Sequence, residues 1–327
     1  MKSMIRTISV CLLIAALVLT VSIAEAQQPT KIPRIGYVSG SSDANNPRPN
    51  EIFQQALREL GYIEGKNILF EYRSAEGSID RIPSLVAELV QLKVDVLVSS
   101  TAQAIRAAKD ATKTIPIVMI VTVDPVATGI VDSLARPGGN ITGLTRLTRE
   151  LSGKRLELFK EVVPRISRVG VLSVVDFTAF KDYEAAASSL KIPLQLFEVR
   201  APNPDLAGVF RDAAKGRLSA LITVRVPLLV RHRKEIAGFA IKNRLPLMSE
   251  STEDVDSGAL VSYSADDVAS FRRAAVYVDK ILKGTKPADI PVEQPKKFEL
   301  IINLKTAQQI GVTIPQSVLY RADKVIK

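Results

Sequence analysis

TIPIVMIVTVDPVATGIVDSLARPGGNITGLT, residues 114–145, contains the most informative strand of the chain. Its run 115–121 is apolar throughout and interrupted only by Pro116. A run of strand length that is apolar on both faces is typical of a strand buried inside a parallel sheet. The same stretch continues with a short apolar segment, 126–135, for which we predict a helix, and then with a second apolar strand, 141–144.

Two residues of this stretch are expected at a ligand cleft. In open α/β sheets, ligands collect just past the carboxyl ends of the strands, where loops and helix N-termini converge. Asp124 and Thr145 follow the two predicted strands and therefore lie at such ends. The stretch is interpreted as the inner edge of a ligand cleft and as the first hinge out of one lobe.

Outward from this stretch, short apolar runs alternate with amphipathic helical patterns along most of the chain. Strands are predicted at 34–38, 67–73, 94–99, 115–121, 141–144, 169–174, 194–199, 220–224, 245–248, 259–262 and 298–302. Helices are predicted at 51–60, 79–92, 102–112, 126–135, 152–163, 179–190, 204–215, 228–243, 266–282 and 304–310. Alternating units of this kind give parallel sheets with helices on both faces. The fold class is therefore α/β, with two Rossmann-like lobes.

The end of the chain indicates that the lobes are not consecutive in sequence. A long helix, 266–282, follows the second series of strands and precedes one isolated strand. This order fits a chain that crosses between lobes near Arg146, Tyr263 and Pro287. The predicted lobe I comprises 27–146 with 264–286, and the predicted lobe II comprises 147–263 with 287–327.

Residues 1–26 have the pattern of a secretory signal peptide. Lys2 and Arg6 precede an apolar core, 8–23, and Ala24-Glu25-Ala26 forms a small-x-small cleavage site. The apolar core is too short for a membrane span. We expect cleavage after Ala26 and export to the periplasm. The mature chain would lack cysteine, since Cys11 is the only one, so neither a disulfide nor a thiolate metal site is expected.

The composition argues against several classes of function. The chain has 44 Lys and Arg against 34 Asp and Glu, but its basic residues are spread along helix faces without interleaved aromatic residues, so no nucleic-acid partner is expected. The single histidine, His232, leaves no second histidine for a metal site, and its position in a predicted helix beside three cations indicates a surface residue rather than a member of a hydrolase triad. Neither a phosphate-binding nor a dinucleotide-binding glycine pattern has the required spacing. No catalytic residue, metal or cofactor is predicted, and the protein is not expected to be an enzyme.

What remains is a set of polar residues at predicted strand ends. Ser99, Ser100 and Thr101 open the helix 102–112, whose start suits a carboxylate or another anion, although one of them could serve only as a helix cap. Asp124 could receive an ammonium group, or it could hold the turn at Pro125. The further ligand-binding candidates are Ser41, Ser42, Thr122, Asn140, Thr142, Phe177, Arg225, Glu250 and Tyr263.

Several longer strings resemble one known family, the periplasmic substrate-binding proteins of ABC transporters of the tryptophan/tyrosine type. They cover nearly the whole mature chain. The strings are IPIV at 115–118, DPV at 124–126, SLARPGGNITG at 133–143, GKRLELFKEVVP at 153–164, RRAAVYVDKILKGTKPADIPVEQP at 272–295 and KFELIINLKTA at 297–307.

This resemblance implies a type I periplasmic-binding fold, with two lobes joined by three crossings. It also implies that strand-end loops hold a small solute between the lobes, here 99–101, 122–124 and 140–142, with Arg225 and Glu250. Relatives often carry a His-Pro loop after the first strand, whereas this chain reads SSDANNPRPN at 41–50, so the ligand can differ.

The expected function is that of a solute receptor that closes like a hinge around a small solute, such as an amino acid or a related carboxylate. Its expected partners are an inner-membrane permease and the ATPase of that permease, and the receptor itself is expected to be a monomer. An alternative is a periplasmic sensing module that delivers its ligand-bound form to a membrane receptor. An exported enzyme on the same scaffold is the third hypothesis.

Overall fold

The computed structural model describes residues 31–40, 48–146, 151–175 and 180–327 of the 327-residue chain. Residues Arg34–Lys327 form one compact unit. The predicted signal peptide lies outside the described residues, and residues 31–33 have no regular secondary structure. Within the described residues, no helix combines the length and the apolar composition that a membrane span requires.

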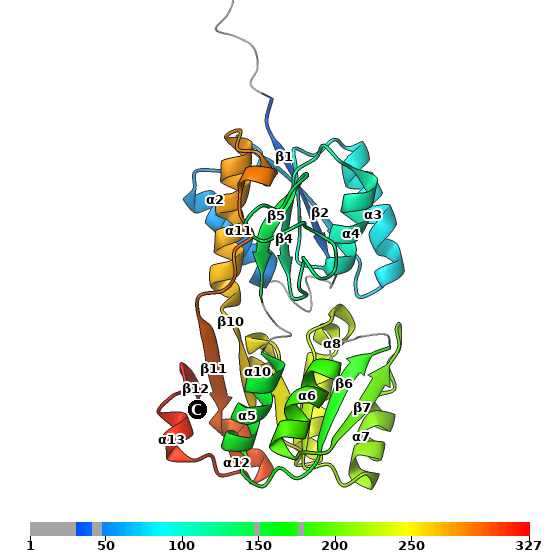
Figure 1. Cartoon of the computed structure of the whole chain (residues 1–327), viewed down its shortest axis with the longest axis vertical. Coiled ribbons are helices and arrows are strands. Elements are labelled where there is room, and N and C mark those ends of the chain that lie inside the picture. Colours follow the sequence, from blue (N-terminus) through cyan, green and yellow to red (C-terminus); the bar gives the residue numbers. More distant parts are fainter. Residues whose placement is uncertain (1–30, 41–47, 147–150, 176–179) are drawn as a thin grey trace, which may run out of the picture. The chain divides into compact units, whose positions relative to one another are not determined.

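The first sheet is entirely parallel and has the strand order β2-β1-β3-β4-β5. Its strands are β1 (Arg34–Ser39), β2 (Leu69–Ser74), β3 (Val96–Ser99), β4 (Ile117–Val121) and β5 (Ile141–Thr145). Its helices are α2 (Arg48–Glu59), η2 (Ile79–Arg81), α3 (Ile82–Gln91), α4 (Ala102–Ala111) and α11 (Asp267–Leu282). Helices α2 and α11 cover one face, and α3 and α4 cover the other (Figure 1).

Strand β4 is buried on both faces, as its unbroken apolar sequence predicts. Val118 and Ile120 pack in the core that includes α2 and α11. Ile117, Met119 and Val121 pack in the opposite core, with α3 and α4. Since successive side chains of a strand point to opposite faces, each of the two cores needs apolar residues at alternate positions of β4.

The second sheet has the strand order β12-β11-β10-β9-β8-β6-β7 and is parallel except where β10 meets β11. Its strands are β6 (Val169–Val174), β7 (Leu194–Val199), β8 (Ala220–Thr223), β9 (Leu247–Ser249), β10 (Val261–Ala265), β11 (Phe298–Asn303) and β12 (Lys324–Ile326). Its helices are α5 (Ser152–Val162), α6 (Phe180–Leu190), α7 (Leu206–Lys215), α8 (Pro227–Arg231), α9 (Arg233–Lys242), α10 (Thr252–Asp256), α12 (Leu304–Ile310) and α13 (Gln316–Leu319).

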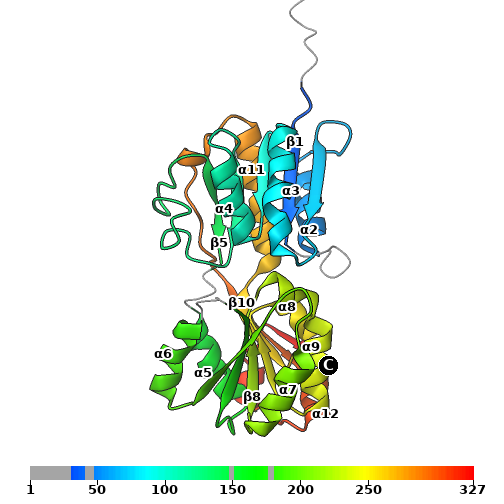
Figure 2. The ribbon, with the colours of Figure 1, turned by 90° about the vertical axis from the view of Figure 1, so that its right-hand side faces the viewer.

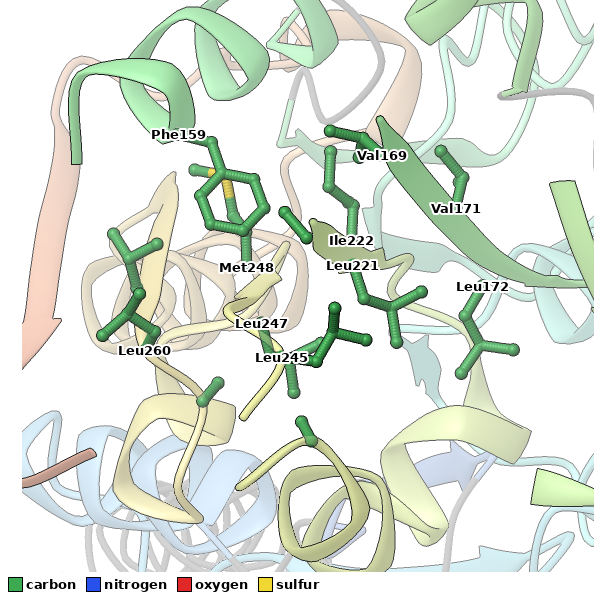
Figure 3. Packing of buried hydrophobic residues seen from close by; sticks show 14 of the residues in the cluster. Phe159, Val169, Val171, Leu172, Leu221, Ile222, Leu245, Leu247, Met248 and Leu260 are labelled. Atoms are coloured by element: carbon green, nitrogen blue, oxygen red, sulfur yellow. The ribbon is translucent and has the colours of Figure 1, made fainter. Parts of the chain in front are cut away.

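Helices cover both faces of the second sheet as well. Figure 2 shows α5 and α6 on one face and α7, α9 and α12 on the other. Figure 3 shows part of the core, in which Phe159 of α5 belongs to the same cluster as Met248 of β9 and Ile222 of β8. The predicted α/β class with two helix-covered, mainly parallel sheets is thus confirmed.

Three local predictions differ from the structure. Residues 126–135 form successive turns rather than a helix, because the carboxylate of Asp124 accepts hydrogen bonds at the start and Gly129 adopts a φ of 66°. The predicted helix 228–243 is divided into α8 and α9 at His232. The short elements α10, α13 and β12 were not predicted, since each has fewer than six residues.

The return of the chain to the second sheet also comes later than predicted. After η3 (Pro287–Asp289), Ile290 and Val292 are buried in the two cores of the first sheet. The N–H of Glu293 donates to the carbonyl of Gly143 in β5 at 3.0 Å. Apolar burial therefore keeps residues 290–293 with the first sheet, whereas the predicted boundary lay at Pro287. From here on, lobe I denotes 34–146 with 267–293, and lobe II denotes 151–265 with 298–327.

Candidate ligand-binding site

A cavity of about 140 Å³ lies at the carboxyl ends of strands from both sheets. This volume is below the roughly 300–1,000 Å³ of typical small-molecule sites, so a ligand of that size requires the cavity to widen. The described residues that line it from lobe I are Tyr37, Ser39, Gly40, Pro49, Asn50, Ile79, Ser100, Thr101, Ala102, Gln103, Thr122, Val123 and Arg146. Those from lobe II are Val174, Arg225, Val226, Pro227, Leu228 and Val230.

The N-terminus of α4 forms one wall of this cavity. Thr101 is its N-cap residue, with an extended backbone, and the Thr101 side chain makes no capping hydrogen bond. Ser99 holds this turn in place, because its hydroxyl donates to the carbonyl of Val38 at 2.8 Å and accepts from the N–H of Thr101 at 3.1 Å. The first N–H groups of a helix have no intrahelical acceptor and carry a partial positive charge. The wall can therefore accept an anionic group.

Two arginines and one aspartate form a buried ionic cluster beside the cavity. Arg146 follows β5 and Arg225 follows β8, so both occupy strand ends. The Nε atom of Arg146 lies 3.2 Å from Oδ1 of Asp267, and Nη1 of Arg225 lies 2.5 Å from Oδ2 of the same carboxylate. Asp267 is the first residue of α11 and begins the second segment of lobe I, whereas Arg146 ends the first segment. The cluster therefore links Arg225 of lobe II to both segments of lobe I.

The pKa values in this cluster follow from burial and from mutual charge. Burial lowers the pKa of Arg146, and the charge of Asp267 only partly offsets this effect. For Asp267, burial raises the pKa, but the charges of Arg146 and Arg225 outweigh it and the pKa is lowered. For Arg225, burial again opposes the charged form, yet Asp267 and Glu253 raise its pKa above the ordinary value. The lowered pKa of Asp267 and the raised pKa of Arg225 both favour the charged forms of this pair.

Two nitrogens of Arg146, Nε and Nη2, are buried without a hydrogen-bond partner among the described residues, although Nε forms an ion pair with Asp267. Its side chain is only 4 % exposed, and its guanidinium lies 5.3 Å from the centre of the Phe271 ring. Its Nη2 atom is shielded from solvent and has no hydrogen-bond partner among the described residues. By contrast, Nη1 of Arg225 also donates to Ser251 at 2.9 Å. Since unsatisfied buried donors are destabilising, Nη2 of Arg146 favours an acceptor supplied by a ligand.

Glu250 takes part in a second buried cluster rather than in the cavity wall. It is 3 % exposed, and its Oε1 atom accepts from the hydroxyl of Tyr183 at 2.7 Å and from Nη1 of Arg155 at 3.3 Å. Its Oε2 atom accepts from the backbone N–H of Arg225 at 2.9 Å. Burial, together with the charge of Glu250, raises the pKa of Tyr183 well above its ordinary value. Glu250 therefore holds the backbone of Arg225 in place without lining the cavity itself.

The structure brings part of the predicted ligand-binding set together. The predicted residues that line the cavity are Ser100, Thr101, Thr122 and Arg225. Three predicted residues, Ser41, Ser42 and Phe177, lie outside the described part of the chain.

Other predicted residues have structural roles away from the cavity lining. Asp124 holds its turn, because its Oδ1 atom accepts from the N–H groups of Val126 at 2.8 Å and Ala127 at 3.0 Å. The carbonyl of Tyr263 accepts from Nε of Arg155 at 2.8 Å, and the Tyr263 ring packs on Phe298. The contacts of Asp124 correspond to the interpretation in which it holds the turn at Pro125.

Asn140 and Thr142, which were also predicted to bind the ligand, do not line the cavity. Asn140 precedes β5, so it lies at the amino end of the strand, where its amide donates to the carbonyls of Ile115 at 2.7 Å and Thr112 at 3.3 Å. The hydroxyl of Thr142 is fully buried and donates to the carbonyl of Ile290 at 2.6 Å. The side-chain amide of Asn140 and the hydroxyl of Thr142 are thus both occupied by hydrogen bonds to backbone carbonyls.

The sequence analysis missed several lining residues, of which Arg146 is the most informative. It was identified only as a crossing point, although it directly follows Thr145 at a predicted strand end. The same rule that selected Thr122 would have selected it. Tyr37 carried no such signal, because a tyrosine within a strand is equally typical of an apolar core. Within the described residues, no group of three or more His, Cys, Asp or Glu side chains is placed to hold a metal ion.

Two helix-covered, mainly parallel sheets with a cavity at their strand ends define a type I periplasmic-binding fold. The family described as ABC transporter substrate binding protein matches residues 46–326, and the chain belongs to this family. A tyrosine-binding protein from Clostridioides difficile is 27% identical over 273 residues, which cover 80% of this chain and 75% of that protein.

Two solved structures support the same assignment. A conserved domain protein from Vibrio cholerae has a TM-score of 0.83 and 27% identity, covering 90% of this chain and 100% of its own. An ABC domain in complex with L-Trp from Streptococcus pneumoniae has a TM-score of 0.82 and 26% identity, covering 90% and 99% of the two chains. The family of substrate-binding proteins implies a small-molecule ligand and a membrane transporter as partner.

Proposed function

We propose that this protein is an exported receptor that captures a small solute between its two lobes and delivers it to an ABC importer. The observation that carries this proposal is the shared cavity, whose lining comes from strand ends of both lobes. A ligand in such a position contacts both lobes only when they are together, so its binding energy favours the closed arrangement. The relatives that bind tyrosine and L-Trp support an amino acid or a related carboxylate as the solute.

Direct contacts between the lobes support hinge closure. Nη1 of Arg231 in α8 donates to the carbonyl of Glu76 in lobe I at 2.9 Å. Near the cavity, Gly40 of lobe I lies against Pro227 of lobe II so closely that a Cβ atom on Gly40 would be 2.9 Å from the Pro227 Cγ atom. These contacts are few and polar or small, so they can break when the lobes separate.

The proposed setting is the periplasm, with cleavage of residues 1–26, and the proposed partner is an inner-membrane permease with its ATPase. Binding rather than catalysis is proposed, because the cavity lining contains no histidine or carboxylate among the described residues. We propose that the receptor acts as a monomer.

The proposal is tested by a thermal-shift screen of residues 27–327 against amino acids, aromatic and aliphatic acids, their amides and sugars. At a hundredfold excess over Kd, a ligand specific for the folded state adds about 2.7 kcal/mol of stability. For a protein of about 300 residues, the corresponding shift in Tm is roughly 4 °C. If no compound class raises Tm, and small-angle scattering shows no compaction with any of them, the receptor proposal is wrong.

Gly40→Ala is expected to weaken the binding of the solute found in that screen about tenfold. The new methyl group would lie 2.9 Å from the Pro227 Cγ atom and 2.8 Å from the Thr101 Oγ1 atom, so the lobes cannot approach as closely. A tenfold change in Kd corresponds to about 1.4 kcal/mol of closure energy. Titration calorimetry measures the affinity, and scattering measures the loss of ligand-induced compaction.

A double variant separates the contact between lobes from the contact within lobe I. Adding Pro227→Ala removes the Cγ atom, so the pair is expected to bind nearly as well as Pro227→Ala alone. If the pair instead keeps the full tenfold defect, the clash with Thr101 is responsible and closure is not limited at Gly40.

A further inference from the structure

The charges that line the cavity are all positive. Among its described lining residues, Arg146 and Arg225 are the only charged side chains. Asp267 pairs with both guanidiniums but is not part of the lining. A ligand entering the cavity therefore encounters guanidinium groups and the positive end of α4, and both favour negative charge.

Arg146 is the better candidate of the two for binding a ligand. Arg225 already donates from Nη1 to Asp267 and to Ser251. Arg146 forms an ion pair with Asp267 through Nε and packs on the Phe271 ring, while neither Nε nor Nη2 has a hydrogen-bond partner among the described residues. This buried guanidinium is thus placed by an ion pair and a ring contact while two of its nitrogens lack a hydrogen-bond acceptor, which is the arrangement expected of a preorganised anion-binding group.

The rest of the lining is suited to an apolar body. The apolar side chains come from both lobes and surround the cavity: Tyr37, Ile79, Val123, Val174, Val226 and Leu228. The other lobe I side chains at the α4 end, Ser100, Thr101 and Gln103, are polar but uncharged. The remainder of the lining also includes the polar residues Ser39, Asn50 and Thr122, so it combines apolar side chains with uncharged polar ones.

We propose that the carboxylate of a small apolar monocarboxylate binds between Arg146 and the N-terminus of α4, and that Arg146 is the residue that selects for this carboxylate. This inference rests on the proposed receptor function and names the chemical class of its solute. It specifies a carboxylate and an apolar body, and it includes acids with or without an amino group. The helix N-terminus and the buried arginine act together, since each lines the same cavity.

The test compares acids with their primary amides, because the two differ little in shape but only the acid carries charge. The probes are straight-chain monocarboxylates from acetate to octanoate, 3-phenylpropanoate and tryptophan, each paired with its amide. For the acids that bind, the wild-type protein is expected to prefer the acid about 10- to 100-fold, the range of a charge-assisted hydrogen-bond pair. In Arg146→Gln, this preference is expected to fall below about threefold.

Arg146→Gln is expected to fold, because Asp267 keeps its partner Arg225. Burial already lowers the pKa of Arg146, so loss of its charge also removes an unfavourable desolvation. Thermal unfolding without ligand verifies this expectation for each variant. Arg146→Lys is expected to recover part of the acid preference, because it restores the charge without the forked donors. The matched control is Arg106→Gln, which removes an exposed cation from α4 and should leave the acid preference unchanged.

The outcomes separate this inference from the receptor function. If an acid binds and Arg146→Gln keeps its preference over the amide, the carboxylate lies elsewhere and the inference is wrong. It is also wrong if the broader screen finds a solute but none of these acids binds. If no small molecule of any class binds, the receptor function itself fails, and the inference fails with it.

Discussion

Glu250→Ala is expected to destabilise lobe II by about 3–5 kcal/mol, the usual effect of removing one partner of a buried ion pair. Arg155 is fully buried, and Glu250 is its carboxylate partner. The substitution also removes the acceptor of the Tyr183 hydroxyl and of the Arg225 backbone N–H. A buried guanidinium, a buried phenol and a buried amide would lose this acceptor at once, so the effects add to a large penalty.

Thermal unfolding followed by circular dichroism measures this effect, and the expected fall in Tm is roughly 10 °C or more. Glu157→Ala is the matched control, since Glu157 pairs with Lys154 at the exposed surface of α5. Such exposed pairs contribute about 0–1 kcal/mol. If Glu250→Ala and Glu157→Ala have the same Tm, the buried cluster does not stabilise lobe II as described.

Gly143→Ala is expected to reduce the stability of lobe I by at least about 4 kcal/mol, which is exceptional for a single methyl group. Gly143 has a φ of 139°, a conformation that strongly favours glycine. A Cβ atom at this position would lie 2.1 Å from the carbonyl oxygen and 2.6 Å from the nitrogen of Met119 in the neighbouring β4 strand. Neither atom belongs to a movable side chain, so the pairing of β4 with β5 must break or shift.

The control for this variant is Gly238→Ala in α9. Nothing lies within 4 Å of a Cβ atom at Gly238, and alanine is the better helix former by about 1 kcal/mol. We therefore expect opposite signs, with Gly238→Ala slightly raising the denaturant midpoint and Gly143→Ala lowering it strongly or preventing purification of folded protein. Equal midpoints for Gly143→Ala and the wild type would contradict the close approach of the two strands.

The fold was largely predictable because apolar periodicity reflects burial on both faces. The run 115–121 contains residues for two cores, and β4 supplies both. The same logic failed at 126–135, where Ile130 and Val131 pack in the core shared with α3 and α4 from a series of turns rather than from one face of a helix. The antiparallel pairing of β10 with β11 was not predictable from periodicity either, since the pairing direction depends on the path of the chain between them.

The candidate site was predictable only at the level of strand ends. This rule leads to Thr122 and Arg225, which line the cavity, because carboxyl ends of parallel strands meet at one edge. It does not distinguish a side chain that faces the cavity from one that satisfies a nearby backbone group, and Ser99 and Glu250 belong to the second kind. That distinction depends on side-chain direction and on hydrogen-bond partners far away in sequence, which a pattern of residue types does not contain.

The late return of the chain to lobe I has a consequence for biosynthesis. Helix α11 contributes Phe271, Tyr277 and Val278 to the same core as Ile35 and Val96, although the whole of lobe II except its last strands lies between them in sequence. During synthesis from the amino end, the first five strands therefore lack part of their hydrophobic core until about residue 293 has been made. A ribosome stalled before residue 267 should present this lobe in a protease-sensitive form, whereas lobe II still lacks only its C-terminal edge.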